Sequence, residues 1–216
     1  MIPPFRMAYL HGFASGPASF KGTVLAEWLR ARGHHLELPD LNEPSFGELT
    51  VTAALGAMDA LDALDSGGRP WRLIGSSMGG YLAARWAQIH PEKVDRMVLL
   101  CPGFDMRARW AALLGPQAMG AWRETGRHLF PDASGVDVGV HWGFVVDGDT
   151  HPRRPEPACP VRVIHGVADE VVPVEISRSY AAEHPDVDLV EVMSDHGLAD
   201  QIPRIQAEVG AFFGVQ

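Results

Sequence analysis

Several features that define whole classes of protein are scarce or absent in this sequence. Only two of its 216 residues are cysteine, Cys101 and Cys159, and neither lies in a CxxC or similar metal-ligand spacing. There is no run rich in lysine and arginine, and 27 acidic against 18 basic residues give a formal net charge of −9. The stretches without charge, such as 73–84, are shorter than the roughly 18 apolar residues that a membrane-spanning helix requires.

Each absence excludes a class. Two separate cysteines make no disulfide framework, and we expect both to be buried thiols in a reducing compartment. Without a basic cluster nothing neutralises phosphate charge, so nucleic acid is excluded as a partner and a polyanionic substrate is disfavoured. No membrane span is expected. The start of the chain, Met1–Arg6, lacks the basic and then apolar pattern of a secretory signal, so we predict a cytoplasmic location.

The composition that remains is that of an ordinary globular protein, with 46% hydrophobic and 21% charged residues. A chain of this length can bury a sizeable core without a disulfide or metal staple. We therefore predict a single domain over residues 1–216.

Short apolar or β-branched runs alternate with longer stretches of helical spacing, which predicts a parallel sheet with helices on both faces, a three-layer αβα sandwich. The predicted strands, about six in all, are Phe5–Leu10, Leu36–Leu38, Trp71–Gly75, Met97–Cys101, Val161–His165 and Val187–Val192. Apolar residues at helical spacing lie within residues 24–29, 55–64, 81–89 and 209–213.

One interval breaks the alternation. Residues 102–160 contain no clear strand–helix unit, and a structureless loop of that length is implausible in a compact domain. We therefore expect a small helical lid insertion over about 102–160. Its aromatic residues include Trp110, Trp122, Phe130, Trp142 and Phe144. The tryptophans would either pack the lid onto the body or wall an apolar ligand pocket.

The clearest chemical motif is the segment 75–80, Gly-Ser-Ser-Met-Gly-Gly, between a predicted strand and a predicted helix. Its middle fits the nucleophile elbow G-x-S-x-G with Ser77 at the centre. Glycine is needed on either side because the turn is too tight for side chains near the nucleophile. The alternative is a glycine-rich βα turn in which Ser77 only caps the helix.

A second motif, His11-Gly12-Phe13, ends the first predicted strand. In an elbow enzyme the oxyanion is bound by the N–H of the residue after the nucleophile and by an N–H from a loop after an early strand. Phe13 and Met78 are the candidate backbone donors. The alternative is an ordinary strand-ending turn in which His11 hydrogen-bonds locally.

A nucleophilic serine needs a base, and the base needs an orienting carboxylate. Asp169 follows a predicted strand and is preferred as the acid over its neighbour Glu170, because a short side chain suits a fixed position in a turn. His196, followed by glycine, is the candidate base. The order serine, acid, histidine is that of α/β-hydrolases and differs from the orders of chymotrypsin and subtilisin.

These motifs, together with Pro39-Asp40-Leu41-Asn42, resemble the α/β-hydrolase superfamily and, within it, the small bacterial YqiA/YcfP-type esterases. The part from about Pro160 to His196 is also similar to mitochondrial acyl-protein thioesterases. The resemblance implies Ser77 as nucleophile, Asp169 as acid, His196 as base and the Phe13 and Met78 amides as oxyanion donors.

The resemblance further implies hydrolysis of carboxylic esters or thioesters of small to medium acyl groups, through an acyl-enzyme and without a cofactor. The expected partner is a small acyl ester or thioester. Two alternatives stay open: a non-catalytic ligand-binding member of the same fold, and the same triad used for carbon–carbon bond hydrolysis or perhydrolysis.

Polar residues near the end of the insertion, His141, Asp147, Asp149 and His151, raise the question of a metal site. Their spacing matches no metal motif, so a solvated loop is the preferred interpretation and no metal is predicted.

Overall fold

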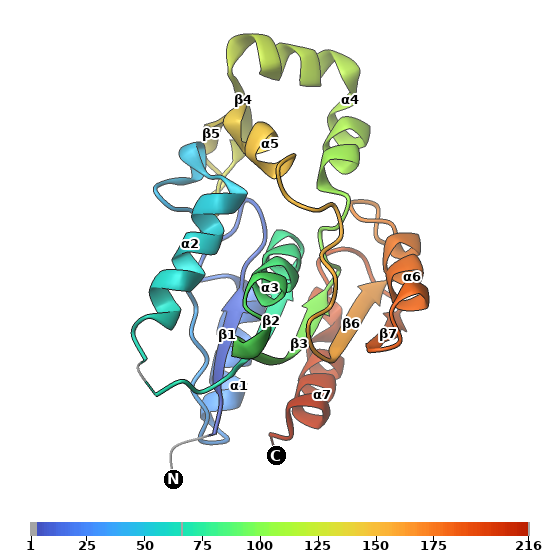
Figure 1. Ribbon diagram of the computed structural model, residues 1–216. Helices are drawn as coiled ribbons and strands as arrows, with labels where there is room; N and C mark the ends of the chain where they lie inside the picture. Colours follow the sequence, from blue (N-terminus) through green and yellow to red (C-terminus); the bar gives the residue numbers. More distant parts are fainter. Residues whose placement is uncertain (1–3, 66, 216) are drawn as a thin grey trace.

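The sheet has five strands in the order β1-β2-β3-β6-β7, and every neighbouring pair is parallel (Figure 1). The computed structural model describes residues 4–65 and 67–215. The strands are β1 (Arg6–Leu10), β2 (Trp71–Ser76), β3 (Val94–Leu100), β6 (Val161–Gly166) and β7 (Val187–Val192). The predicted parallel sheet is therefore confirmed, with small shifts at the strand ends.

Of the six strands predicted from the sequence, the one at residues 36–38 was wrong, and the sheet has five strands. Residues 36–38 form no strand and make only a single parallel bridge, between Glu37 and Ala8 of β1. Leu36 is buried, so the apolar pattern was real. A side chain can be buried without the hydrogen-bond ladder of a strand. An apolar pattern over only three residues cannot distinguish a buried irregular segment from a paired strand.

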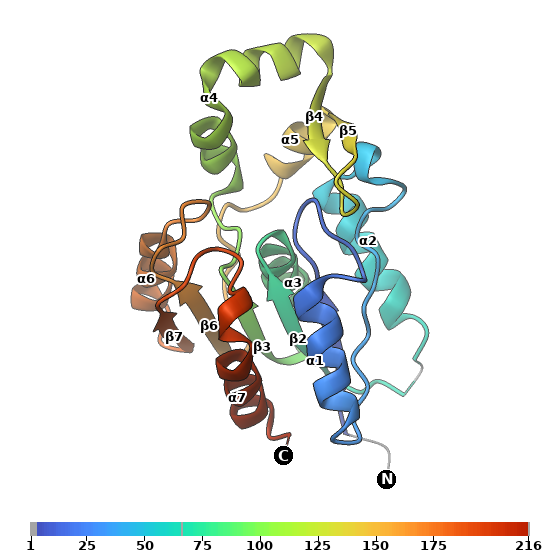
Figure 2. The same ribbon diagram turned by 180° about the vertical axis from the view of Figure 1, so that it is seen from behind.

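Helices cover both faces of the sheet, which confirms the three layers. Figures 1 and 2 show α2, α3 and α6 on one face and α1 and α7 on the other. These helices are α1 (Phe20–Arg30), α2 (Val51–Asp62), α3 (Met78–Ile89), α6 (Val174–Glu183) and α7 (Ile202–Phe213), and the short 3₁₀ turns are η1 (Phe46–Glu48), η2 (Pro91–Lys93) and η3 (Ala199–Gln201). The sequence did not predict α6, which buries little more than one stripe of its surface.

The core lies on both sides of the sheet because successive strand residues point to opposite faces. In β1, Ala8 and Leu10 pack on the side of α2 and α3, whereas Met7 and Tyr9 pack on the side of α1 and α7. Strands buried on both faces read as continuous apolar runs, which is why the sequence revealed them.

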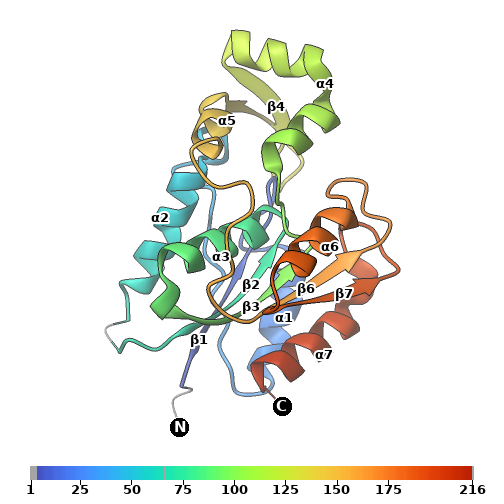
Figure 3. The same ribbon diagram turned by 45° about the vertical axis from the view of Figure 1, so that its right-hand side comes forward.

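Between β3 and β6 the chain forms α4 (Met106–Thr125), β4 (Arg127–Pro131), β5 (Asp137–His141) and α5 (Gly143–Gly148). We call residues 102–160 the insertion. The expected helices are present as α4 and α5, but the insertion also contains an antiparallel hairpin of β4 and β5, which was not expected. Only Phe130 and Val140 of that hairpin are buried, so its apolar signal is weak. Helix α4 bends sharply at Gly115 (φ 76°) and Pro116 (Figure 3).

All five strands end at the same edge of the sheet, and the insertion stands over that edge (Figures 1 and 3). In open parallel sheets, ligands bind in the crevice outside the carboxyl ends of the strands. The loops after β1, β2, β6 and β7 carry the candidate site residues. Among the described residues, no helix is long and apolar enough to cross a membrane.

Candidate active site

Ser77 lies in the sharp turn between β2 and α3, with φ 54° and ψ −120°. A positive φ is uncommon for a residue with a side chain and needs support from its surroundings. The Ser77 N–H donates to the carbonyl of Leu100 (2.9 Å), and its carbonyl accepts from the N–H of Gly103 (2.8 Å). These bonds tie the turn to the end of β3.

The glycines of the motif are required by close backbone contacts. A Cβ on Gly75 would lie 2.4 Å from the carbonyl oxygen of Gly79, and one on Gly79 would lie 2.0 Å from that of Leu10. Both distances are far below van der Waals contact. The glycines thus allow α3 to begin directly against the ends of β1 and β2, as the elbow interpretation predicted.

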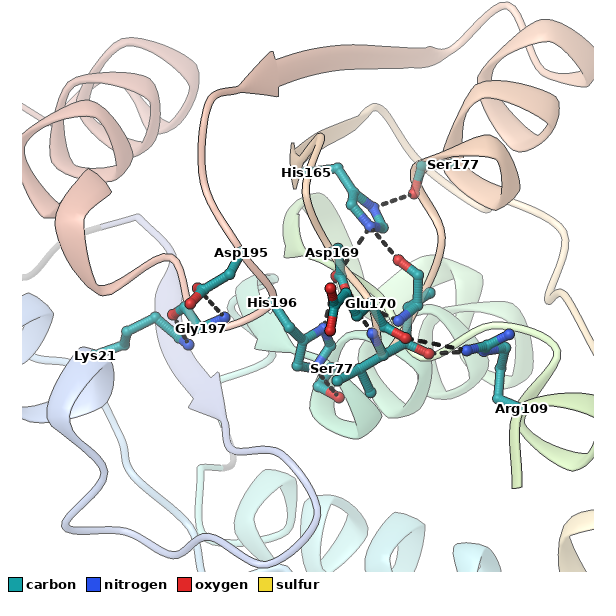
Figure 4. Close-up of polar contacts among 12 residues, drawn as sticks. Lys21, Ser77, Arg109, His165, Asp169, Glu170, Ser177, Asp195, His196 and Gly197 are labelled. Atoms are coloured by element: carbon teal, nitrogen blue, oxygen red, sulfur yellow. Dashed lines mark hydrogen bonds and ion pairs between the residues drawn. The ribbon is translucent and has the colours of Figure 1, made fainter. Parts of the chain in front are cut away.

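The three residues predicted from sequence meet at this edge (Figure 4). His196 Nε2 lies 2.9 Å from Ser77 Oγ, and His196 Nδ1 lies 2.7 Å from Asp169 Oδ2. Since the carboxylate can only accept, Nδ1 carries the proton and Nε2 is left to accept from the Ser77 hydroxyl. The serine is thus hydrogen-bonded to an unprotonated ring nitrogen.

Asp169 is fully buried at its side chain and is hydrogen-bonded at both carboxylate oxygens. Oδ1 accepts from the N–H groups of Val171 (2.8 Å) and Val172 (2.7 Å). Burial by itself would raise the pKa of Asp169, but hydrogen bonds from His165, His196 and Val172 outweigh it and hold that pKa well below its usual range. The carboxylate therefore stays ionised at neutral pH. Its contribution to stability is present at neutral pH and is lost as the pH falls below the unfolded-state value.

His165, in the predicted strand before Asp169, is a site residue that the sequence interpretation left without a role. It is fully buried, its Nε2 lies 2.8 Å from the Val172 carbonyl and 3.2 Å from Asp169 Oδ2, and its Nδ1 lies 2.7 Å from Ser177 Oγ. The carbonyl requires a proton on Nε2, so Nδ1 accepts from the serine hydroxyl. The signal that could have found it is its position four residues before the acid.

The loop after β1 lies against Ser77. A Cβ on Gly12 would lie 3.3 Å from Ser77 Cβ and 3.9 Å from its Oγ, and the next residue, Phe13, lines the same cavity as Ser77. The Met78 amide opens α3, where first-turn N–H groups have no helical acceptor. Neither amide donates a hydrogen bond to another described residue.

His11 stabilises the loop after β1. It is buried, its Nε2 accepts from the N–H of Leu41 (3.0 Å), and its Nδ1 donates to the carbonyl of Gly12 (2.9 Å). Burial lowers the pKa of His11, so it remains neutral in this role. Asn42 Nδ2 adds a bond to the carbonyl of Ser15 (2.8 Å). His11 therefore holds the loop that carries Phe13 through one local bond, to Gly12, and one distant bond, from Leu41.

Two further contacts fix the loops of the acid and the base (Figure 4). Lys21 Nζ of α1 donates to the carbonyl of Gly197 (2.6 Å), directly after His196. From the insertion, Arg109 Nε of α4 donates to the carbonyl of Val171 (2.7 Å), in the turn that holds Asp169. The insertion thus contacts the acid loop directly.

The polar residues considered for a metal site have other partners. Asp147 accepts from Thr52, Asp149 pairs with Arg107, and His141 contacts the carbonyl of Leu49. In the described part of the chain, one group has the ligand types of a metal site at close range, namely Cys101, His165 and Asp169. Burial raises the pKa of the Cys101 thiol, whereas metals bind the thiolate, and the other two are hydrogen-bonded to each other.

The cysteine expectation holds in part. Cys101 is buried, whereas Cys159 is only half-buried, and neither forms a disulfide. Burial raises the pKa of the Cys159 thiol to about 12.

A cavity of about 510 Å³ contains Ser77 and His196, and Phe13, Lys21 and Ala133 also line it. A second cavity of about 510 Å³ lies beneath α4 and α5, and Trp110, Phe144 and Tyr81 line it. Of the three insertion tryptophans, Trp110 alone lines either cavity, and it does not reach the one with Ser77. The tryptophans therefore pack within the insertion and, through Trp110, against Phe13 of the body, in line with the packing interpretation and not with the alternative of a wall beside Ser77.

One family model matches residues 6–213, and its description is "Uncharacterised protein family (UPF0227)". Among named proteins, mouse (Mus musculus) palmitoyl-protein thioesterase ABHD10, mitochondrial, is 26% identical over 205 residues, which cover 89% of this chain and 69% of that one. The pimeloyl-(acyl-carrier protein) methyl ester esterase of Aeromonas hydrophila is 29% identical over 110 residues, covering 50% of this chain and 42% of that protein.

Solved structures agree with the fold. Alpha/beta hydrolase domain-containing protein 10 from mouse superposes with a TM-score of 0.78 at 24% identity, covering 99% of this chain and 90% of that one. The predicted α/β-hydrolase fold is thereby confirmed.

Proposed function

The chain belongs to the UPF0227 family, and we propose that it is a serine hydrolase that cleaves carboxylic esters or thioesters of small to medium acyl groups through an acyl-enzyme. One observation carries the proposal: a single imidazole, that of His196, lies 2.9 Å from Ser77 Oγ and 2.7 Å from the buried carboxylate of Asp169. The names of the relatives, a thioesterase and a methyl ester esterase, support the same reaction class.

In the proposed reaction Ser77 Oγ attacks the acyl carbonyl carbon while His196 Nε2 takes the hydroxyl proton. The tetrahedral intermediate collapses when His196 returns that proton to the leaving alcohol or thiol, which leaves Ser77 acylated. Water then attacks the acyl-enzyme with His196 again as base. Asp169 keeps the imidazole in the required tautomer and stabilises the imidazolium, and no group beyond this chain and water is needed.

The Phe13 and Met78 amides are the proposed oxyanion donors. They come from two loops that meet at Ser77, and their N–H groups are not used by other described residues. Such donors act mainly on the charge that develops in the transition state. We further propose that the insertion, residues 102–160, is a lid on a single domain of residues 1–216, and that the protein acts in the cytoplasm.

A fluorophosphonate probe tests the nucleophile. Native protein should be labelled at Ser77, and Ser77→Ala should lose both the label and the hydrolysis of p-nitrophenyl acetate. Ser76→Ala is the matched control, because it removes the neighbouring hydroxyl and should keep the label. Labelling of Ser77→Ala, or none of the native protein, would refute the proposal. Ligand-induced stabilisation without turnover of esters or acyl-CoA thioesters would favour the non-catalytic alternative.

The base is tested by pH. Only a neutral imidazole can accept the Ser77 proton, and the hydrogen bonds to Asp169 keep that carboxylate ionised. We therefore expect kcat/KM to fall as the pH is lowered from about 8 to about 5. If kcat/KM for p-nitrophenyl acetate stayed constant over that pH range, His196 would not be the base.

A further inference from the structure

The two cavities differ in chemistry although their volumes are alike. The cavity with Ser77 is lined by polar groups that include Ser15, Ser19 and Lys21. The cavity beneath the insertion is lined largely by apolar side chains, among them Val51 and Met106. An alkyl chain attached to Ser77 would be stabilised by entering the second cavity, because the burial of methylene groups away from water is favourable.

The Phe13 ring stands between the two. Phe13 lines the cavity with Ser77, and its ring centroid lies 4.9 Å from that of Trp110 and 5.4 Å from that of Phe144, which both line the other cavity. The rings of Phe46 (5.0 Å) and Phe130 (5.1 Å) complete its surroundings. Four aromatic contacts hold this ring in place.

The insertion contributes little to the wall of the cavity with Ser77. Among the described residues that line it, Ala133 in the β4–β5 turn is the only one from the insertion. The Phe13 ring instead contacts rings of the insertion that line the other cavity. In the proposed reaction the same residue supplies its N–H to the oxyanion.

We propose that the Phe13 ring sets the acyl-chain limit of this site, so that Ser77 accepts short acyl groups and a long alkyl chain is kept out of the apolar cavity beneath the insertion. The inference rests on the proposed function and narrows its substrate class. It predicts a short-chain specificity for this chain, in contrast to the palmitoyl group in the name of the mouse relative.

The test is a chain-length series on the full chain, with p-nitrophenyl acetate, butyrate, octanoate and palmitate. For the native protein we expect kcat/KM to fall by about ten-fold or more from butyrate to octanoate. Phe13→Ala should raise the octanoate-to-butyrate ratio by about ten-fold. The ratio is the readout because any disturbance of the oxyanion loop lowers kcat/KM for both substrates alike.

Trp110→Ala is the matched control. It removes a ring of the same cluster that does not line the cavity with Ser77, so it should leave the ratio unchanged even if it lowers stability. An equal shift in Trp110→Ala and Phe13→Ala would overturn the inference, since general loosening of the insertion would then explain both. Equal native rates on butyrate and octanoate would overturn it too.

A binding measurement separates this inference from the proposed function. Titration calorimetry with sodium octanoate compares Ser77→Ala with the double variant Ser77→Ala/Phe13→Ala. Tighter binding by the double variant supports the role of Phe13 whether or not the native protein turns over esters, and equal binding overturns it. Failure of fluorophosphonate labelling overturns the proposed function alone.

Discussion

At the carboxyl edge of the sheet, Asp169 lies among directional hydrogen bonds, whereas Trp122 of the insertion lies among aromatic rings and makes one bond, from its Nε1 to the carbonyl of Val140 (2.9 Å). Both side chains are fully buried. Hydrogen bonds specify the position of single atoms, and ring packing specifies a filled volume. The carboxyl edge of the sheet therefore positions the reacting groups, whereas the insertion stabilises the fold and shapes a cavity.

The largest expected effect is at the edge. Asp169→Asn keeps the shape of the side chain but places an amide where His196 Nδ1 donates, so it favours the wrong tautomer. We expect kcat to fall about 10⁴-fold, measured with p-nitrophenyl acetate, while circular dichroism shows a retained fold. Glu170→Gln, the adjacent carboxylate, is the control and should change kcat little. Comparable losses in both variants would show that the acid is misassigned.

In the insertion, Trp122→Ala should act on stability. Removal of a fully buried indole should lower the free energy of unfolding by about 3–5 kcal/mol, measured by urea denaturation. Leu129→Ala in the same hairpin, with a side chain 63% exposed, should change it by less than about 0.5 kcal/mol. If the folded Trp122 variant lost hydrolysis as completely as Asp169→Asn, the division between the two regions would be wrong.

His165→Gln should have an intermediate effect that appears in kcat and leaves KM unchanged. It removes the ring that contacts Asp169 and the Val172 carbonyl, and a charge-assisted bond contributes about 1.5–3 kcal/mol, which corresponds to about a ten- to hundred-fold loss. Ser177→Ala should lose less, and Ser177→Thr, which keeps the hydroxyl, should restore the rate. A change in KM alone would exclude a role in positioning the acid.

The smallest effect is expected at the surface of the insertion. Arg107 pairs with Asp149, but its side chain is 71% exposed, so water and salt screen the pair. Arg107→Ala should change the free energy of unfolding by less than about 1 kcal/mol in urea denaturation. A larger loss would mean that ion pairs, as well as rings, hold the insertion together.

The sequence by itself determined the sheet and the order of the candidate site residues. Strands buried on both faces read as apolar runs, and glycine-rich turns mark where the chain must reverse closely, as at Gly75 and Gly79. The proximity of Ser77, Asp169 and His196 in space was predictable because each residue follows a strand, and parallel strands end at one edge of the sheet. The strand predicted at residues 36–38 was wrong because a buried irregular segment and a paired strand have the same apolar pattern over three residues.

Only the tertiary structure decided what the insertion does and which neighbours act on the site. The hairpin β4–β5 is half exposed, so its apolar pattern is weak. The contacts of Phe13 with Trp110 and Phe144 join residues that are 97 and 131 positions apart. His165 likewise gains its relation to Asp169 only through the turn that follows β6. Local patterns report which residues are buried, but the partners of a buried side chain depend on how distant segments pack.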